Sequence, residues 1–387
     1  LYSRALFTAN PFSWVDLHGQ FLYSRPHSTA RLAQQNTGNF FDFSILTFYA
    51  AQADAVAGEA RRPHSSGSFS AELRPLRRVR VLESWMTDRL HNAGSAMLSE
   101  MLLAGARTVN VGGVFAANRL VLNYNQQQVD VVVDVTSALA LRGGYRYVWG
   151  DAQTPPGLIN LRFGDWSGEL RRHVGVAGAS LRLGQKFRGS VDFEASPGDR
   201  AFFRASLNDY QKARIRARYQ LRPSLALTGN LGLLENLNPA PGVSYDFLSR
   251  DQSLGVNWNP WGGDYVGLLA EYSRSTVRSD ILYRVPSTLG RELSYYRERA
   301  HAGTALVDVK LPGSAVVKPK LSLGGSLFAS GGSRPARYYQ PLARAAVAFK
   351  DRLEWNWEWR WYALTQQFYL FEGFRTHQFT TGLRVTM

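Results

Sequence analysis

Hydrophobic and polar residues alternate one by one along most of the chain, which is the period of a β-strand. In residues 351–362, DRLEWNWEWRWY, every second residue is large and apolar: Leu353, Trp355, Trp357, Trp359 and Trp361. Four of the residues between them are charged: Arg352, Glu354, Glu358 and Arg360. Taken alone, this strand fits a soluble sandwich, where the tryptophans meet a second sheet, or a membrane barrel, where they meet lipid.

The same two-residue period recurs from end to end, with no convincing helical period between the segments. Further examples lie at residues 128–135, 139–149, 187–195, 305–311 and 321–329. Nearly every segment has a polar second face, whereas a soluble core of so many strands would need covering helices or a second domain. The pattern therefore predicts an all-β fold, a transmembrane antiparallel β-barrel whose apolar faces meet lipid.

The connections between these segments alternate in length. Short polar turns are expected at residues 184–186, 222–224, 259–263 and 350–351. Long stretches rich in Gly, Pro, Ser or Asn lie at residues 52–67, 91–117, 151–170, 235–248, 283–293 and 330–337. Short turns at one end and long loops at the other are typical of an outer-membrane barrel, with the short turns in the periplasm.

The apolar phase slips by one residue at 125–128 and again at 208–211. Each slip is either a tight hairpin or a bulge within one long strand, and the bulge keeps short and long connections in alternation. This interpretation predicts about 16 to 18 strands and a single barrel domain over residues 1–387. Residues 1–66 are the hardest part to divide into strands.

Composition removes several classes of protein. The chain is 45% hydrophobic and has no run of apolar residues long enough for a spanning helix. It contains no cysteine, which excludes disulfides, thiolate zinc sites, iron–sulfur ligation and covalent haem attachment through CxxCH. Because the chain begins at Leu1, we expect a mature or truncated product whose targeting segment is missing.

The net charge is +15, and only 6 of the 45 basic residues are lysines. The arginines are spread singly along strands and not in basic runs, so no nucleic-acid partner is predicted. The most basic segment is KARIRARYQL, whose charged side is expected to line a pore, with Asp192 and Glu194 as candidate ion-pair partners. The predicted pore-lining residues are Lys212, Arg214, Arg216, Arg218, Arg142, Arg146, Arg188, Asp192, Glu194, Arg352, Glu354, Glu358 and Arg360. The predicted lipid-facing residues are Leu353, Trp355, Trp357, Trp359 and Trp361.

No enzymatic motif is present. The sequence has no GxSxG, HExxH, GxxxxGK[ST] or GxGxxG opening a helix, and its seven histidines show no ligand spacing. The balanced charges of 352–360 suit a salt-bridged wall better than a substrate site. We therefore expect no catalytic residues, no metal site and no cofactor.

The last strand, HQFTTGLRVTM (377–387), resembles the C-terminal signal strand of bacterial outer-membrane β-barrels, although Met387 stands where that family usually has an aromatic residue. This resemblance implies the outer membrane of a Gram-negative-type bacterium, contact with membrane lipid, and a homo-oligomer as one arrangement. The segment ELRPLRRVRVLESWMTDR (72–89), with a charged strand pair about Arg74–Pro75, is similar to the porin sheaths of porin–cytochrome electron conduits.

Three functions fit these patterns. The leading hypothesis is a porin that gives passive passage to small, preferably anionic solutes, with residues 91–117 or 151–170 folded inward as a constriction. The alternative is a sheath that leaves its lumen clear for a partner such as a multihaem cytochrome. A soluble glycan-binding β-protein is the non-membrane alternative.

Overall fold

The computed structural model describes residues 2–42, 47–154, 166–202, 206–239, 244–261, 265–284, 290–314, 316–350, 352–366 and 373–386. The regular secondary structure in these ranges consists of β-strands. They are β1 Tyr2–Phe12, β2 Val15–Ser24, β3 His27–Asp42, β4 Thr47–Arg61, β5 His64–Leu76, β6 Val79–Ala104, β7 Arg107–Asp134, β8 Leu139–Thr154, β9 Trp166–Leu183, β10 Phe187–Pro197, β11 Asp209–Arg222, β12 Leu225–Asn238, β13 Ser244–Trp258, β14 Val266–Arg284, β15 Arg291–Lys310, β16 Val317–Gly332, β17 Ala336–Phe349, β18 Leu353–Gln366 and β19 Phe374–Val385. Within the described ranges, no helix is long and apolar enough to span a membrane.

The chain divides into two compact units. Unit 1 comprises Leu1–Val131, Tyr145–His173 and Asp199–Phe203, and unit 2 comprises Val132–Gly144, Val174–Gly198 and Arg204–Met387. The strands β7, β8 and β9 contribute residues to both units. The prediction of one domain over 1–387 stays a prediction.

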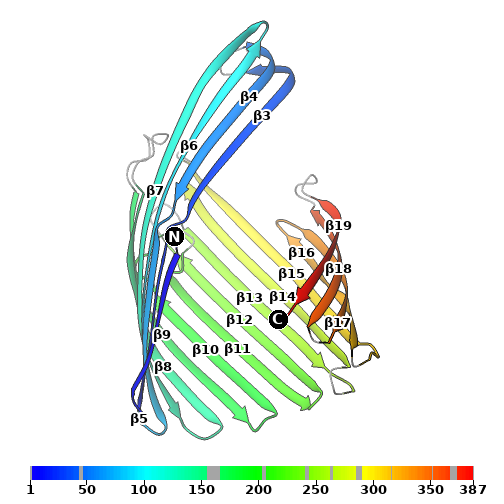
Figure 1. Cartoon of the computed structure of the whole chain (residues 1–387). Helices are drawn as coiled ribbons and strands as arrows, with labels where there is room; N and C mark the ends of the chain where they lie inside the picture. The colour runs from blue at the N-terminus through cyan, green and yellow to red at the C-terminus, as the bar shows by residue number, and fades with distance from the viewer. Residues whose placement is uncertain are drawn as a thin grey trace. The chain divides into compact units, whose positions relative to one another are not determined.

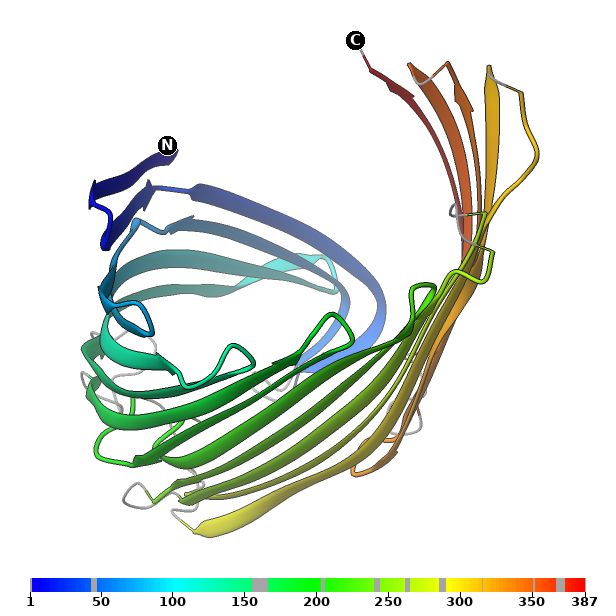
Figure 2. The same cartoon turned by 90° about the horizontal axis from the view of Figure 1, so that it is seen from below.

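In unit 2, β9 to β19 pair antiparallel, each strand with the next along the chain. Figure 1 shows β10 to β19 side by side in this order, and Figure 2 shows the same sheet curving along its length. The predicted turns at 184–186 and 222–224 lie between paired strands, as does Lys350 of the turn at 350–351, whose second residue lies outside the described ranges; Gly184 adopts a left-handed φ of 56°. The turn expected at 259–263 also joins two paired strands, although residues 262–264 lie outside the described ranges.

Unit 1 has a less regular order, because two of its strands are interrupted by proline. β2 pairs with β1 and β5, while β3 pairs with β4. The 26-residue β6 pairs with β5 along one part and with β4 along the next. The breaks between β2 and β3 and between β4 and β5 fall at Pro26 and Pro63, whose missing N–H groups interrupt the ladder. The two breaks are adjacent, since the Arg62 N–H donates to the Pro26 carbonyl at 3.1 Å.

These interruptions account for the strand count. The structure describes nineteen strands, one more than the upper end of the predicted range. Counting each proline-interrupted pair as one strand brings the number inside that range. All four pieces lie within residues 15–76, largely the segment that was hardest to divide from its sequence.

Several expected loops are strands instead. Residues 52–67 lie mostly in β4 and β5, and residues 91–117 belong to β6 and β7, which a two-residue turn at 105–106 connects. The Gly, Ala and Ser residues that suggested loops pair in the ladder because cross-strand bonding uses the backbone and not the side chain. Figure 1 shows β3 and β4 beside the far parts of β6 and β7.

The two phase slips have different outcomes. Residues 118–134 form part of the single strand β7, so the interpretation of one long strand is confirmed there. The second interpretation is wrong, because β11 begins only at Asp209 and residues 198–208 connect β10 to β11. The strand pair predicted about Arg74–Pro75 is present as β5 and β6, but its turn lies at 77–78, and the pairing register shifts between Leu73 and Leu76.

Candidate functional site

The strands of unit 2 have one polar and one apolar face. On β10 and β11, the direct cross-strand pairs Asp192–Arg214, Glu194–Lys212, Ser190–Arg216 and Arg188–Arg218 share the face that we call the polar face. The opposite, apolar face exposes large side chains, including Val191, Phe193, Ile215, Leu227, Leu254 and Trp258. A surface of this kind is unusual in a soluble monomer and typical of one in contact with lipid.

The basic row of β11 is only partly neutralised. Arg216 Nη2 lies 3.0 Å from Asp192 Oδ2, and Lys212 Nζ lies 3.9 Å from Glu194 Oε1, so both predicted acidic partners are in place. Arg214 and Arg218 have no ion-pair partner among the described residues. The carboxylate directly opposite Arg214 is the one that Arg216 binds. The row therefore keeps a cationic excess.

Three arginines face one another across neighbouring strands. Arg188 on β10 stands opposite Arg218 on β11 and opposite Arg182 on β9. None of them has an acidic partner within the part of the chain that the structure describes. Like charges placed directly opposite destabilise a sheet, so this row has a cost in folding free energy. Arg182 was missed in the sequence, although its neighbours Leu181 and Leu183 show the alternation that places it on the polar face.

Glycines lie beside the charged groups on neighbouring strands, and charged side chains occupy the space above them. A Cβ added to Gly178 would lie 3.3 Å from Asp192 Oδ1 and 3.8 Å from the Arg142 side chain. On the other side of Arg214, Gly232 separates that residue from Asp251. Longer side chains can therefore spread across two strands at these points.

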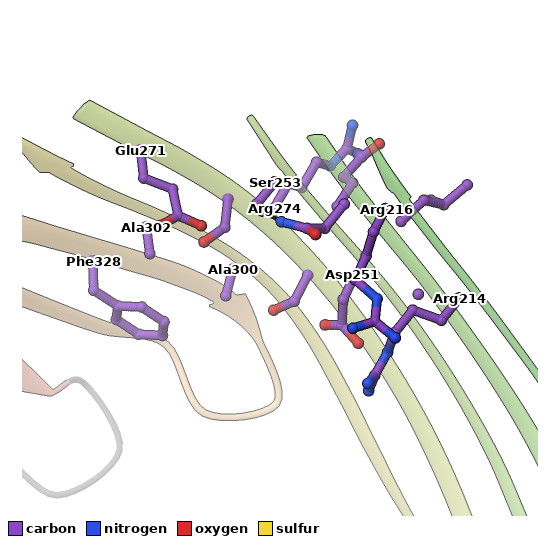
Figure 3. A pocket seen from close by; sticks show the side chains of 15 residues that line it. Arg214, Arg216, Asp251, Ser253, Glu271, Arg274, Ala300, Ala302 and Phe328 are labelled. Atoms are coloured by element: carbon purple, nitrogen blue, oxygen red, sulfur yellow. Dashed lines mark hydrogen bonds between the residues drawn. The ribbon is translucent and has the colours of Figure 1, made fainter. Parts of the chain in front are cut away.

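The polar face of β11 to β16 encloses a hollow of about 620 Å³. Its polar lining includes Arg214, Arg216, Asn230, Asp251, Ser253 and Glu271. Figure 3 shows Arg214 and Arg216 extending toward the Asp251 carboxylate, with Ala300, Ala302 and Phe328 further along the sheet. Asp251 and Glu271 were not among the predicted pore-lining residues, because their strands carry few charges on this face.

Part of the β10–β11 connection packs within unit 1. Phe202 is buried against Val148, Ala152 and Leu170. By strand alternation, Val148 lies on the same face of β8 as Arg146, so this apolar cluster covers the polar face locally. Arg200 forms an ion pair with Glu169 in the same unit.

The rest of this connection packs within unit 2. Asn236, which is 1% exposed, accepts a hydrogen bond from the Asn208 N–H at 2.8 Å and donates one to the Ser206 carbonyl at 3.2 Å. Leu207 packs against the buried cluster of Val174, Val176 and Tyr210. The described parts of this connection, residues 198–202 and 206–208, thus each make specific contacts within their own unit.

This finding corrects the predicted constriction. Residues 91–117 do not fold inward, because they form strands. For the other candidate, 151–170, residues 155–165 lie outside the described ranges, and the residues on either side belong to β8 and β9. Phe202 and Leu207 of the β10–β11 connection instead pack on a strand face, each within its own unit, and this stretch was expected to be part of a strand.

The arginines of β8 lie on the polar face as expected. Arg146 Nε donates to Gln128 Oε1 at 2.7 Å, and Gln128 in turn donates to Asp130 at 2.7 Å. Both Gln128 and Asp130 are buried. Arg146 is therefore fixed within unit 1 by a polar network.

On the charged face of β18, ion pairs gather around Glu358, and the prediction of a salt-bridged wall along the whole row stays a prediction. Glu358 receives two arginines, Arg360 from its own strand and Arg344 from β17, whose Nε lies 2.8 Å from Glu358 Oε2. Glu354 stands opposite Arg384 of β19, and Arg352 precedes the strand in the turn. Arg344 was not among the predicted residues, because its own strand is mostly apolar.

The apolar residues of β18 lie together on the other face. Leu353, Trp355 and Trp357 stand opposite Phe349, Val347 and Ala345 of β17. Trp355 is 43% exposed, and its ring centroid lies 4.2 Å from that of Trp357. Trp359 and Trp361 lie on the same face and flank His377 of β19. Lipid contact for these residues stays a prediction, which this placement fits.

No group of three or more His, Asp or Glu residues that could hold a metal ion is found in the described parts of the chain.

Comparison with known proteins gives the fold. No protein-family model and no curated protein sequence matches the chain. Among solved structures, the chain is similar to the RagAB peptide importer in its closed-closed state, with a TM-score of 0.60 and 8% identity over 94% of this chain. The match spans 57% of that chain's length. The siderophore receptor PirA from Acinetobacter baumannii is more distant, with a TM-score of 0.47 and 9% identity over 99% of this chain and 73% of that one.

The paired strands, the exposed apolar face and the RagAB match agree with one another. The predicted fold class is confirmed: the chain is all-β and antiparallel, with the fold of the Gram-negative outer-membrane β-barrel proteins that it resembles, and the predicted outer-membrane location agrees with this fold.

Proposed function

We propose that this chain is the barrel of an outer-membrane transport protein through which anionic solutes pass along the polar face. The observation that carries the proposal is the excess of unpaired arginines on that face. Transport as the class of function is supported by the likeness to the RagAB importer. The soluble glycan-binding alternative does not fit a membrane-barrel fold.

The charge balance of β9 to β11 on this face favours anions. Arg182, Arg188, Arg214 and Arg218 lack acidic partners among the described residues, while the nearby Asp192 and Glu194 are already neutralised by Arg216 and Lys212. A wall of low dielectric constant concentrates the field of such charges in the water beside it and raises the local concentration of counter-ions. The row of three arginines destabilises the sheet, which supports a functional reason for keeping it.

The connection 198–208 favours a pore over a sheath. A sheath for a guest protein needs a clear inner wall, whereas Phe202 and Leu207 cover part of the polar face with buried contacts. A pore for small solutes tolerates such a covering, because it narrows the passage and selects by size. The sheath for a multihaem cytochrome is therefore the weaker hypothesis.

The test is ion selectivity in planar bilayers. We expect single-channel steps with anion preference, and we expect the double variant Arg188→Gln with Arg218→Gln to lower the anion-to-cation permeability ratio by about threefold or more. The matched control is Arg31→Gln with Arg107→Gln, which removes the same charge from exposed positions on β3 and β7 and should leave the ratio unchanged. An absence of conductance steps, or a cation preference in the unmodified protein, would overturn the proposal.

A further inference from the structure

A group of cationic residues interrupts the apolar face of unit 2. On β13, β14 and β15, strand pairing aligns Gln252 with Arg274 and His301, and the next row aligns Arg250 with Thr276 and Arg299. Alternation places both rows on the same face as Leu254 and Tyr272. We call Arg250, Arg274, Arg299 and His301 the outer arginine cluster. Alternation directs the cluster to the surface opposite the arginines of the proposed pore, and Arg274 also borders the hollow of the polar face (Figure 3).

The arginines of this cluster are exposed and have no acidic partner among the described residues. One step further along the same face, the available carboxylates are already used. Arg278 lies 2.6 Å from Asp246 and 3.4 Å from Asp280, and Arg297 also binds Asp280. Arg278 and Arg297, which lie farther from Leu254 and Tyr272, are thus neutralised by carboxylates. The three arginines of the cluster, which lie nearer to these apolar residues, have no acidic partner among the described residues.

The cluster borders directly on the apolar band. The row next to Gln252, Arg274 and His301, on the side of the short turns after β11 and β13, consists of apolar residues and a glycine. Strand pairing aligns Leu254, Tyr272, Gly303 and Leu327 there. Leu254 is 69% exposed, and Tyr272 Oη lies 2.7 Å from His301 Nδ1, so the tyrosine presents its ring to the band and its hydroxyl to the cluster. Tyrosine is enriched at this height, where hydrocarbon meets lipid headgroups.

The apolar band is hollowed next to the cluster. A depression of about 750 Å³ is lined by Gly303, Ala305, Gly325, Leu327, Tyr339 and Trp361, among others. At Gly303 a side chain would meet nothing within 4 Å, whereas at Gly325 a Cβ would lie 2.5 Å from the Gln340 carbonyl. The depression is therefore open at Gly303 and closed by backbone at Gly325.

We propose that the outer arginine cluster binds the phosphate groups of an anionic glycolipid in the adjoining leaflet, with one acyl chain of that lipid lying in the depression at Gly303. Guanidinium groups bind phosphate through paired, charge-assisted hydrogen bonds, and three unpaired guanidiniums match a headgroup with more than one phosphate. The expected placement of the short turns in the periplasm puts the cluster at the outer leaflet. The arginines of the cluster complement the charge of a phosphorylated headgroup, and the neighbouring depression at Gly303 fits an acyl chain. Together they fit one amphipathic ligand.

The test uses the full chain in detergent micelles and native mass spectrometry. The probes are a bis-phosphorylated, hexa-acylated glucosamine disaccharide lipid, the same lipid without phosphates, phosphatidylglycerol and inorganic phosphate. We expect saturable binding of the phosphorylated lipid, and we expect Arg274→Ser with Arg299→Ser to weaken it by about tenfold or more. The control Arg31→Ser with Arg107→Ser removes the same charge elsewhere and should retain binding.

A second variant tests the acyl-chain contact separately. Gly303→Leu fills open space without a clash, so folding should be unaffected while binding of the phosphorylated lipid weakens several-fold. Equal binding of the dephosphorylated lipid, or of phosphatidylglycerol, would overturn the proposal, as would unchanged binding in the Arg274→Ser, Arg299→Ser variant. Saturation by inorganic phosphate alone would indicate a free-anion site and would also overturn it. None of these outcomes depends on conductance, so the proposed pore and the proposed lipid site can fail independently.

Discussion

The arginines of β11 have different electrostatic environments, and the pairing of β11 with its neighbouring strands explains the difference. Arg216 binds Asp192, whereas Arg214, two residues earlier, is without an acidic partner among the described residues. Strand alternation in the sequence predicts which face each residue occupies. It does not predict which of two neighbouring arginines reaches a shared carboxylate, because that depends on the register between strands.

Asn236 holds the end of the β10–β11 connection in unit 2 through two hydrogen bonds. We expect Asn236→Ala to destabilise the connection by about 1–3 kcal/mol, because the Asn208 N–H and the Ser206 carbonyl each lose a buried partner. Limited proteolysis should then cleave within residues 198–208 faster than in the unmodified protein. The control is Asn230→Ala on the same strand, where the asparagine is exposed and its side chain donates to Ser253 Oγ. Equal cleavage rates in both variants would contradict this role of Asn236.

At the scale of elements, proline and register decide what the alternating pattern becomes. Residues 27–61 show enough alternation to form strands, yet Pro26 and Pro63 divide them from β2 and β5. The result is that β6 pairs with two different strands in succession. The composition of 52–67 and 91–117 predicted loops. The prediction failed because small and polar residues are common in loops and also in the parts of strands that do not contact lipid.

The strand β18 provides a test of which face meets lipid. Replacing Trp355, Trp357, Trp359 and Trp361 by Phe should remove a large part of the tryptophan fluorescence that brominated acyl chains quench, because these rings lie on the apolar face. Iodide in the water should quench the remaining fluorescence to the same extent as before. Unchanged quenching by brominated lipid would place this face away from the membrane.

At the scale of the whole chain, the exposed apolar side chains predict a dependence on amphiphiles. Large hydrophobic residues are exposed on strands from both units, for example Leu32, Leu254 and Leu383. In water such a surface associates, while detergent covers it at no cost to the backbone hydrogen bonds.

We therefore expect the purified chain to be monodisperse in detergent and to aggregate when the detergent is removed. Size-exclusion chromatography with light scattering measures this directly, and circular dichroism in detergent should show a strand-rich spectrum. As a control, the same chain returned to detergent should recover its elution volume. A monodisperse species in plain buffer would contradict the membrane fold.

The sequence by itself determined the strand type, the two faces and the membrane-barrel class, because a period of two with a polar second face is a local property of neighbouring residues. It also placed the arginines of β11 with their partners Asp192 and Glu194, since those residues lie in adjacent segments. Only the tertiary structure decided that Arg182 joins the arginine row, that Ser206 and Asn208 bond to Asn236, and that Arg250, Arg274 and Arg299 gather at the edge of the apolar band. Each of these depends on register between strands or on packing of a connection, and both are set by contacts between residues that are far apart in the sequence.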